Sequence, residues 1–379
     1  MAISRRTLLE TIGAGVVGAV TAPAVASTRD EVAGNSVRGS GPIRLHRNES
    51  AYGPSPKATA AIRNAAVDAK AYPEAAADAL RRKIAGHHGV SADRVVLGCG
   101  SSEILRMSID AFARSDRKRI VAALPTFDTV GSLARTAGCE VVGVPLRKDW
   151  SHDVGALLAR ADATAGVVYI CNPHNPTGTL TRRSDLESLI QQAPPHVVVV
   201  IDEAYHDFVG VAADYASFID RPVKSERVIV TRSFSTVHGL AGLRIGYAIT
   251  DMKTARALEL QRLADGVNMA AARAAAAALD DREHLQTVLE KIANDRQEFL
   301  NEANARMLRS VDSLANFVML NTGRKAETVV EHFGKHAIRL SGPVPNFEMY
   351  VRVSLGTHAE MREFWRVWDL LPGGHTMVM

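Results

Sequence analysis

The chain has 379 residues, a length that allows one large domain and one smaller domain, each with its own core. Hydrophobic residues make up 46% of the sequence and charged residues 23%, a balance that excludes an intrinsically disordered chain. The formal net charge of +4 arises from basic residues with acidic residues interspersed among them, so nucleic acid is not indicated as a partner.

The N-terminal segment has the pattern of an export signal. Arg5 and Arg6 form a twin-arginine pair, a weakly apolar run covers residues 12–20, and a small-x-small cleavage site covers residues 24–26. The run is too short and too glycine-rich for a transmembrane helix. An accidental Arg-Arg pair before a helix is the alternative. We expect residues 1–26 to be a twin-arginine signal peptide and the mature protein to be periplasmic, with no membrane segment after cleavage.

The segment that follows is polar and rich in glycine and serine, which predicts a flexible tether over residues 27–47. Short β-branched runs then alternate with helical patterns, which favours an α/β fold with a mostly parallel sheet buried on both faces. Seven strands are predicted, at residues 94–97, 120–123, 141–144, 166–170, 197–201, 228–231 and 245–249. We assign residues 48–253 to this large domain.

The character of the sequence changes after Asp251. Residues 254–308 form a long alanine-rich stretch with few helix breakers, typical of a hinge helix followed by a second helix. Strands are predicted at residues 317–320, 337–340 and 349–353. The sequence therefore predicts a smaller α+β domain over residues 254–379.

Several motifs stand at the ends of the predicted strands, where parallel sheets bind their ligands. Gly100-Ser101-Ser102 opens a helix directly after a strand, an arrangement that suits a phosphate. Asp202 ends a fully apolar strand, and a carboxylate there is costly unless a cation pairs with it. The stretch of residues 172–178, Asn-Pro-His-Asn-Pro-Thr-Gly, is long enough to be rare by chance. No Cys/His spacing matches a metal site.

Together with the segment of residues 232–247, Arg-Ser-Phe-Ser-Thr-Val-His-Gly-Leu-Ala-Gly-Leu-Arg-Ile-Gly-Tyr, these motifs resemble the class I/II aminotransferases. These are pyridoxal-phosphate (PLP) enzymes of fold type I. Residues 48–54 and 71–74 resemble the histidinol-phosphate aminotransferase branch. In the family, a lysine that forms a Schiff base with PLP occupies the position of Thr236. The resemblance thus implies PLP as cofactor, amino-acid and 2-oxo-acid substrates, and a homodimer with shared active sites.

The resemblance also assigns roles to individual residues. Asp202 holds the pyridine nitrogen protonated so that the ring can withdraw electrons. Phe127 stacks on the ring, and Arg352 grips the substrate carboxylate. The implied cofactor-binding residues are Gly100, Ser101, Ser102, Phe127, Asn175, Asp202, Tyr205, Ser233, Arg244 and Tyr72, the last reaching into the neighbouring subunit. The implied substrate-binding residues are Tyr52, Arg352 and Arg339, although Arg339 reads almost equally well as a surface strand residue.

Thr236 leaves three interpretations open. Its hydroxyl is neither nucleophilic nor basic enough to replace a lysine amine at neutral pH. The chain is then a transaminase impaired at one residue, a PLP- and amino-acid-binding protein without turnover, or an enzyme that uses His238 or His206 as base.

Overall fold

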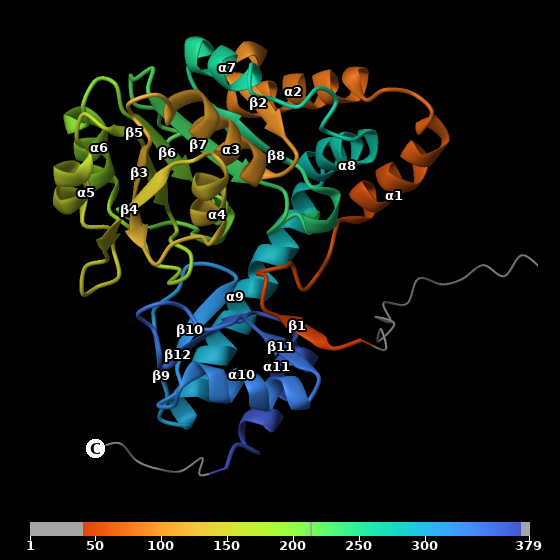
Figure 1. Cartoon of the computed structure of the whole chain (residues 1–379). Helices are drawn as coiled ribbons and strands as arrows, with labels where there is room; N and C mark the ends of the chain where they lie inside the picture. Colours follow the sequence, from red (N-terminus) through yellow and green to blue (C-terminus); the bar gives the residue numbers. More distant parts are fainter. Residues whose placement is uncertain (1–40, 213, 373–379) are drawn as a thin grey trace, which may run out of the picture. The chain divides into compact units, whose positions relative to one another are not determined.

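The computed structural model describes residues 41–212 and 214–372, and a seven-stranded sheet is its largest element (Figure 1). The strand order is β2-β8-β7-β6-β5-β3-β4. β8 is antiparallel to both of its neighbours, and all other adjacent pairs are parallel. The strands are β2 (Val95–Gly98), β3 (Arg119–Leu124), β4 (Glu140–Pro145), β5 (Ala165–Cys171), β6 (Val198–Asp202), β7 (Val228–Ser233) and β8 (Gly246–Ile249). The predicted mostly parallel sheet is confirmed, strand by strand.

Helices cover both faces of this sheet, which explains why its central strands are apolar throughout. Successive side chains of a strand point to opposite faces, so Val167 packs in one hydrophobic cluster and Val168 in another. One cluster contains α3 (Ser101–Phe112), α4 (Thr129–Thr136) and α7 (Met252–Glu259). The other contains α1 (Pro56–Ala65), α2 (Glu74–His88), α5 (Val154–Arg160), α6 (Arg183–Gln192) and α8 (Met269–Leu279). Short 3-10 helices lie at η1 (Ala66–Asp68), η2 (Ala92–Arg94), η3 (His206–Phe208) and η4 (Ala241–Leu243).

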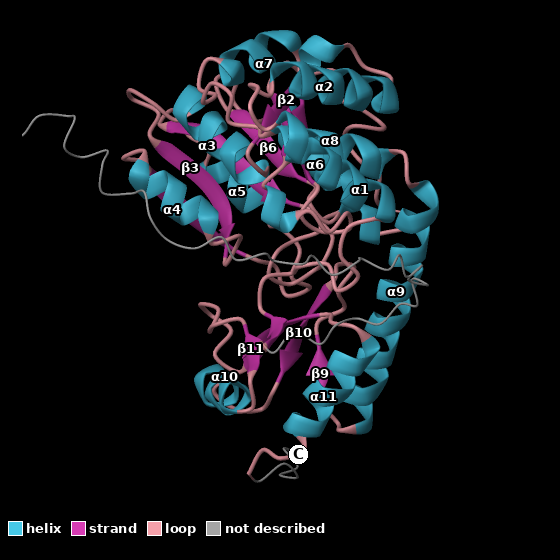
Figure 2. Ribbon diagram, turned by 90° about the vertical axis from the view of Figure 1, so that its right-hand side faces the viewer, coloured by secondary structure: helices cyan, strands magenta, loops and turns pink. Residues whose placement is uncertain are grey.

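A second group of strands follows the long helix α9 (Arg282–Ala305), as the sequence predicts for the C-terminal part. Figure 2 shows α9 running from the neighbourhood of α8 towards β10 and α11. Buried aromatic rings join α9 to α11, with Phe299 and Trp365 4.9 Å apart between centroids. The elements are β9 (Arg309–Ser310), β10 (Phe317–Asn321), α10 (Ala326–Lys335), β11 (Ile338–Leu340), β12 (Tyr350–Ser354) and α11 (His358–Trp368). β12, β10 and β9 form an antiparallel sheet in that order.

Two expectations differ from the structure. Residues 43–45 do not belong to a tether: they form β1 (Ile43–Leu45), which pairs in parallel with β11 and buries Leu45. The long helical stretch also contains three helices where a hinge helix and a second helix were predicted: α7 ends at Glu259, α8 begins only at Met269, and α9 begins at Arg282. Asn268 caps α8 by accepting a hydrogen bond from the Ala271 amide, which stops the helix from extending backwards.

The proposed signal peptide, residues 1–26, lies outside the described residues. Within the described part of the chain, no helix has the length and apolar character needed to cross a membrane.

Candidate active site

The predicted phosphate-binding residues come together at the N-terminus of α3. Gly100 precedes the helix with φ of +79°, a conformation that favours glycine. A Cβ atom at Gly100 would lie 2.3 Å from Nη2 of Arg244, so only glycine lets this guanidinium approach the backbone. No side chain caps α3, which leaves its first amides and the nearby Arg244 available to an anion. The Ser233 hydroxyl accepts a hydrogen bond from the Ser235 amide, 3.0 Å away, within the segment that carries Arg244.

Asp202 ends β6 as a buried carboxylate without an ion-pair partner among residues 41–212 and 214–372. It accepts hydrogen bonds from the Tyr169 hydroxyl at 2.8 Å, the Thr231 hydroxyl at 3.0 Å and the Ala204 amide at 3.1 Å. Burial raises the pKa of Asp202, and these donors partly offset that rise. A buried carboxylate of this kind is costly when it is ionised unless a cation pairs with it.

Tyr205 and Asn175 form the centre of a hydrogen-bonded chain. The Tyr205 hydroxyl oxygen accepts from Nδ2 of Asn48 at 2.9 Å and from Nδ2 of Asn175 at 3.3 Å. Because both contacts donate to this oxygen, the Tyr205 proton is free for a further acceptor. Burial raises the pKa of Tyr205, which keeps that proton in place at neutral pH.

Arg352 extends this chain from β12. Its Nη1 donates to Oδ1 of Asn175 at 2.7 Å and its Nη2 donates to the His46 carbonyl at 2.9 Å. Within the described ranges its buried Nε has no hydrogen-bond partner, and Nη1 and Nη2 each keep a second N–H group. The guanidinium therefore lies beside the predicted cofactor residues with donors left for an anion.

Thr236 lies against the same turn. Its hydroxyl donates to the Ala204 carbonyl at 2.8 Å, and the residue is 6% exposed. Lys253 is on α7 with an exposed side chain that pairs with Glu226. Lys291, which the sequence did not single out, lies over the ring of Tyr52 at 4.9 Å from Nζ to the centroid.

The remaining predicted residues do not all join this arrangement. The Tyr52 hydroxyl donates to Oδ2 of Asp295 on α9 at 2.5 Å, and Phe127 is half-buried against the cluster of α3 and α4. Tyr72 is 77% exposed. Arg339 is exposed on β11, opposite Arg44 of β1.

The two histidines considered as alternative bases do not contact Asp202. His206 shares a hydrogen bond with the Tyr215 hydroxyl, 2.8 Å from its Nδ1. His238 lines a separate cavity together with Asp207 and Arg232. Burial lowers the pKa of both histidines. Their positions give no support to the interpretation in which either acts at the predicted cofactor site.

Sequence reasoning missed Asn48, Tyr169 and Thr231 as supports of the site. Tyr169 and Thr231 reach Asp202 from the adjacent strands through sheet register, since Asp202 lies opposite Thr231 on β7 and opposite Cys171 on β5. The sequence signal that could have indicated this support was Tyr169, a single tyrosine in the apolar run of β5.

A family model described as aminotransferase class I and II matches residues 40–367. The chain is 34% identical over 319 residues to the histidinol-phosphate aminotransferase of Akkermansia muciniphila, which covers 84% of this chain and 86% of that protein. It is 34% identical over 322 residues to the histidinol-phosphate aminotransferase of Bacillus subtilis strain 168, covering 85% of this chain and 89% of that protein.

Among solved structures, the fold is similar to the histidinol-phosphate aminotransferase of Sinorhizobium meliloti in complex with pyridoxal-5'-phosphate. The TM-score is 0.80 at 30% identity, over 86% of this chain and 89% of that chain. The matched range includes both the seven-stranded sheet and the strands that follow α9. The chain therefore belongs to the class I and II aminotransferase family and has the fold type I architecture of PLP-dependent transferases.

Proposed function

We propose that this chain binds PLP at the carboxyl ends of β6 and β7 and holds an amino acid beside it. The observation that carries the proposal is the hydrogen-bonded set of Tyr205, Asn175 and Arg352, with Asp202 three residues before Tyr205. Among the described residues, the Tyr205 proton and part of the Arg352 guanidinium have no partner. Both unused donors are of the kind that a ring oxygen and a substrate carboxylate would accept.

Each residue then has a role that follows from its chemistry. When bound, PLP supplies an electron-withdrawing ring for the substrate carbon. Asp202 stabilises a positive charge on the ring nitrogen, and the Tyr205 hydroxyl donates to the ring oxygen. Phosphate would be held by the free amides of α3, by Ser233 and by Arg244. Phe127 offers a flat apolar partner for the ring.

We infer that Thr236 occupies the place of the family's Schiff-base lysine. Its hydroxyl donates to the Ala204 carbonyl, and a threonine side chain has neither an amine for an imine nor a group basic enough to take a proton from carbon at neutral pH. Loss of a positioned general base costs about 10²–10⁴ in rate. The chain is accordingly a transaminase scaffold with impaired or absent turnover, and a non-catalytic PLP- and amino-acid-binding protein of the periplasm is the alternative.

The similar proteins are named for histidinol phosphate, but we propose a free amino acid as the ligand at Arg352, with a 2-oxo acid as its transamination partner. This assignment depends on the twin-arginine pattern at Arg5 and Arg6, because an exported protein does not meet a phosphorylated cytoplasmic intermediate. Saturable binding of histidinol phosphate, tighter than that of any amino acid tested, would contradict it.

We further propose a homodimer in which Tyr72 contributes to the partner's cofactor site. The supporting observation is that Tyr72 is 77% exposed, a high value for a large aromatic residue.

The mode of PLP binding tests the proposal directly. The mature protein is mixed with PLP, its absorbance spectrum is recorded, and borohydride is added before intact mass is measured. We expect the spectrum of the PLP aldehyde and no increase in protein mass, because Thr236 cannot form an imine. A mass increase by one reduced pyridoxyl group, mapped to any lysine, would show that another amine serves the site. No spectral change on mixing would contradict cofactor binding itself.

A further inference from the structure

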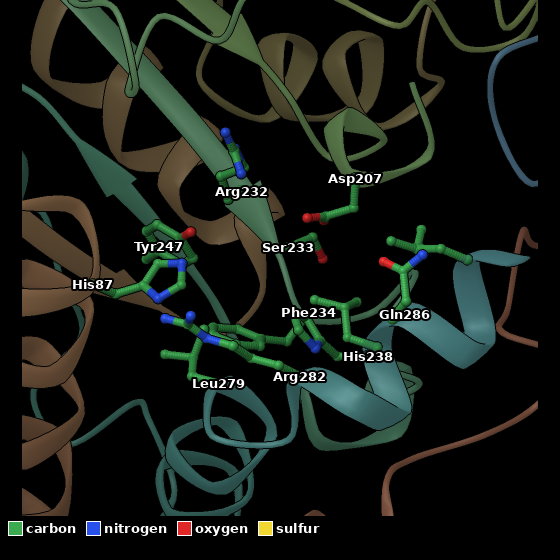
Figure 3. A pocket seen from close by; sticks show the side chains of 12 residues that line it. His87, Asp207, Arg232, Ser233, Phe234, His238, Tyr247, Leu279, Arg282 and Gln286 are labelled. Atoms are coloured by element: carbon green, nitrogen blue, oxygen red, sulfur yellow. The ribbon is translucent and has the colours of Figure 1, made fainter. Parts of the chain in front are cut away.

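A cavity lies beside the segment that carries Thr236. It has a volume of about 240 Å³ and includes none of the residues assigned to PLP or substrate except Ser233. Since a water molecule occupies about 30 Å³ in the liquid, the cavity is large enough for a small organic molecule. Figure 3 shows its walls: α2 with His87, the ends of β7 and β8, the turn that carries Asp207, and the first turns of α9.

The Asp207 carboxylate lines this cavity, and the backbone hydrogen bond that it accepts comes from its own residue. Within the described ranges, no side chain donates a hydrogen bond to it or pairs with it. Arg232, the neighbouring cation, donates instead to Oε2 of Glu203 at 3.0 Å and to the Ser217 hydroxyl at 2.8 Å. Burial opposes the ionisation of Asp207, but the neighbouring Arg232 guanidinium is the largest influence against it, and the pKa of Asp207 lies below its usual value.

At this end of the cavity two carboxyl groups, those of Glu203 and Asp207, lie near one guanidinium. Arg232 pairs with Glu203 and forms no ion pair with Asp207, whose pKa lies below its usual value. Burial lowers the pKa of His87 and His238, so neither histidine adds a positive charge at neutral pH. A ligand ammonium group would supply both the missing charge and the missing hydrogen-bond donors.

The opposite end carries the complementary charge. Arg282 is the first residue of α9, and in the part of the chain that the structure describes it has no ion pair. Figure 3 shows its guanidinium beside His87, across the cavity from Asp207. Apolar side chains also line the cavity, namely Phe234, Leu279, Leu285 and Leu289.

We propose that this cavity is a second binding site, for a free α-amino acid with an apolar side chain, distinct from the substrate site at Arg352. Asp207 binds the ammonium group, Arg282 binds the carboxylate, and the leucine side chains of α8 and α9 receive the apolar part. Neither charge alone would select such a ligand, but their placement at opposite ends matches a zwitterion.

The site adjoins the cofactor segment. Ser233, Phe234 and His238 line the cavity, and Thr236 lies between them in sequence. The same cavity is walled by α9, which continues to β9 and β10. An amino acid bound here would contact both elements, and any effect of its binding on the affinity for PLP would be matched by an equal effect of PLP on its own affinity.

Calorimetric titration with L-leucine tests the site on the mature chain saturated with PLP. In an Arg352→Gln background, which weakens the substrate site, we expect L-leucine still to bind at one molecule per chain. Adding Arg282→Gln or Asp207→Asn should weaken this binding by about tenfold or more, because each removes a charge-assisted hydrogen bond. The matched control is Arg63→Gln, an exposed arginine on α1, which should leave the affinity unchanged.

Two analogues separate the charges. 3-Methylbutylamine lacks the carboxylate and 4-methylpentanoate lacks the ammonium group, and each should bind at least about tenfold more weakly than L-leucine. The proposal is overturned if Arg352→Gln abolishes all binding of L-leucine, or if Arg282→Gln and Asp207→Asn both leave its affinity intact. Wild-type protein provides an independent reading: two sites per chain are expected, and Arg282→Gln should remove one of them.

Discussion

At the scale of single residues, the proposed site combines a set of polar contacts with Thr236, at the position that we infer to be that of the family's lysine. Asp202, Tyr205, Asn175 and Arg352 are linked by hydrogen bonds or lie on one turn, and the Thr236 hydroxyl bonds to that same turn at Ala204. The arrangement does not depend on a lysine for its stability, because none of these contacts involves position 236 except the one to Ala204.

Thr236→Lys should therefore raise transaminase activity without rearranging the site. We expect the variant to convert added amino acids and PLP to 2-oxo acids and the pyridoxamine form about 10²–10⁴ times faster than the natural chain, since a positioned base is restored. The conversion is followed by absorbance in a single half-reaction. Thr236→Met is the control, because it matches the length of lysine without an amine. Equal rates for the lysine and methionine variants would argue for a site that only binds.

The buried carboxylate of Asp202 predicts a pH-dependent stability. Its folded-state pKa is raised by burial, so the proton is bound more tightly in the folded state, and the wild type loses stability as pH rises through that pKa. In Asp202→Asn, position 202 carries no titratable group and contributes no pH dependence to the free energy of unfolding. Urea unfolding at about pH 5 and about pH 7.5 should show that the free energy of unfolding of the wild type, relative to Asp202→Asn, is larger at the lower pH.

The same variant should bind PLP about 10- to 100-fold more weakly, because it loses a hydrogen bond to a charged group. Asp116→Asn, at an exposed position, is the control and should change neither quantity. A pH-independent difference between wild type and Asp202→Asn would contradict the raised pKa.

How much of the site the sequence could predict depends on whether contacts are local. Asn175, Asp202, Tyr205 and Arg352 stand in recognisable stretches, and the structure brings them together. The donors to Asp202 from Tyr169 and Thr231 depend on the register of three strands, which no local pattern encodes.

At the scale of elements, the strands were predictable because a sheet buried on both faces leaves continuous apolar runs. The helices after Glu259 were less predictable from the sequence. Alanine-rich sequence favours helix everywhere, and the interruption depends on the cap at Asn268 and on the positive φ of Asp265, a single-residue conformation. β1 was missed because three residues after a polar segment carry too little periodicity to indicate a strand.

Helix α11 offers a test of how one cap stabilises an element. Thr357 and Glu360 form a capping box, in which the Thr357 hydroxyl accepts from the Glu360 amide and Oε2 of Glu360 accepts from the Thr357 amide at 2.8 Å. Thr357→Ala should lower the free energy of unfolding by about 1 kcal/mol, measured by urea titration. Thr287→Ala, at an exposed position inside α9, should stay within about 0.5 kcal/mol of the wild type. An equal loss in both variants would rule out a capping effect.

At the scale of the whole molecule, the cellular compartment of the protein determines which ligands it meets. We predict that replacing both Arg5 and Arg6 with lysine traps the chain in the cytoplasm, because the twin-arginine route requires the arginine pair. Cell fractionation with an antibody against the mature chain measures this. Unchanged recovery from the periplasm would contradict the proposed export route, and with it the argument against histidinol phosphate.

The buried ion pair of Glu203 and Arg232 restricts how these two positions can change during evolution. Glu203 is 1% exposed, Arg232 is nearly as buried, and the two are joined at 3.0 Å. Replacing one partner leaves the other charge buried without its ion pair. This lowers the free energy of unfolding by about 3–5 kcal/mol, a large part of the stability of a typical domain. A protein in which only Glu203 or only Arg232 has been replaced is therefore disfavoured by selection for stability. Positions 203 and 232 should therefore covary among descendants of this sequence, exchanged together for an apolar pair or kept together, while Ser217 is free to vary once both have changed.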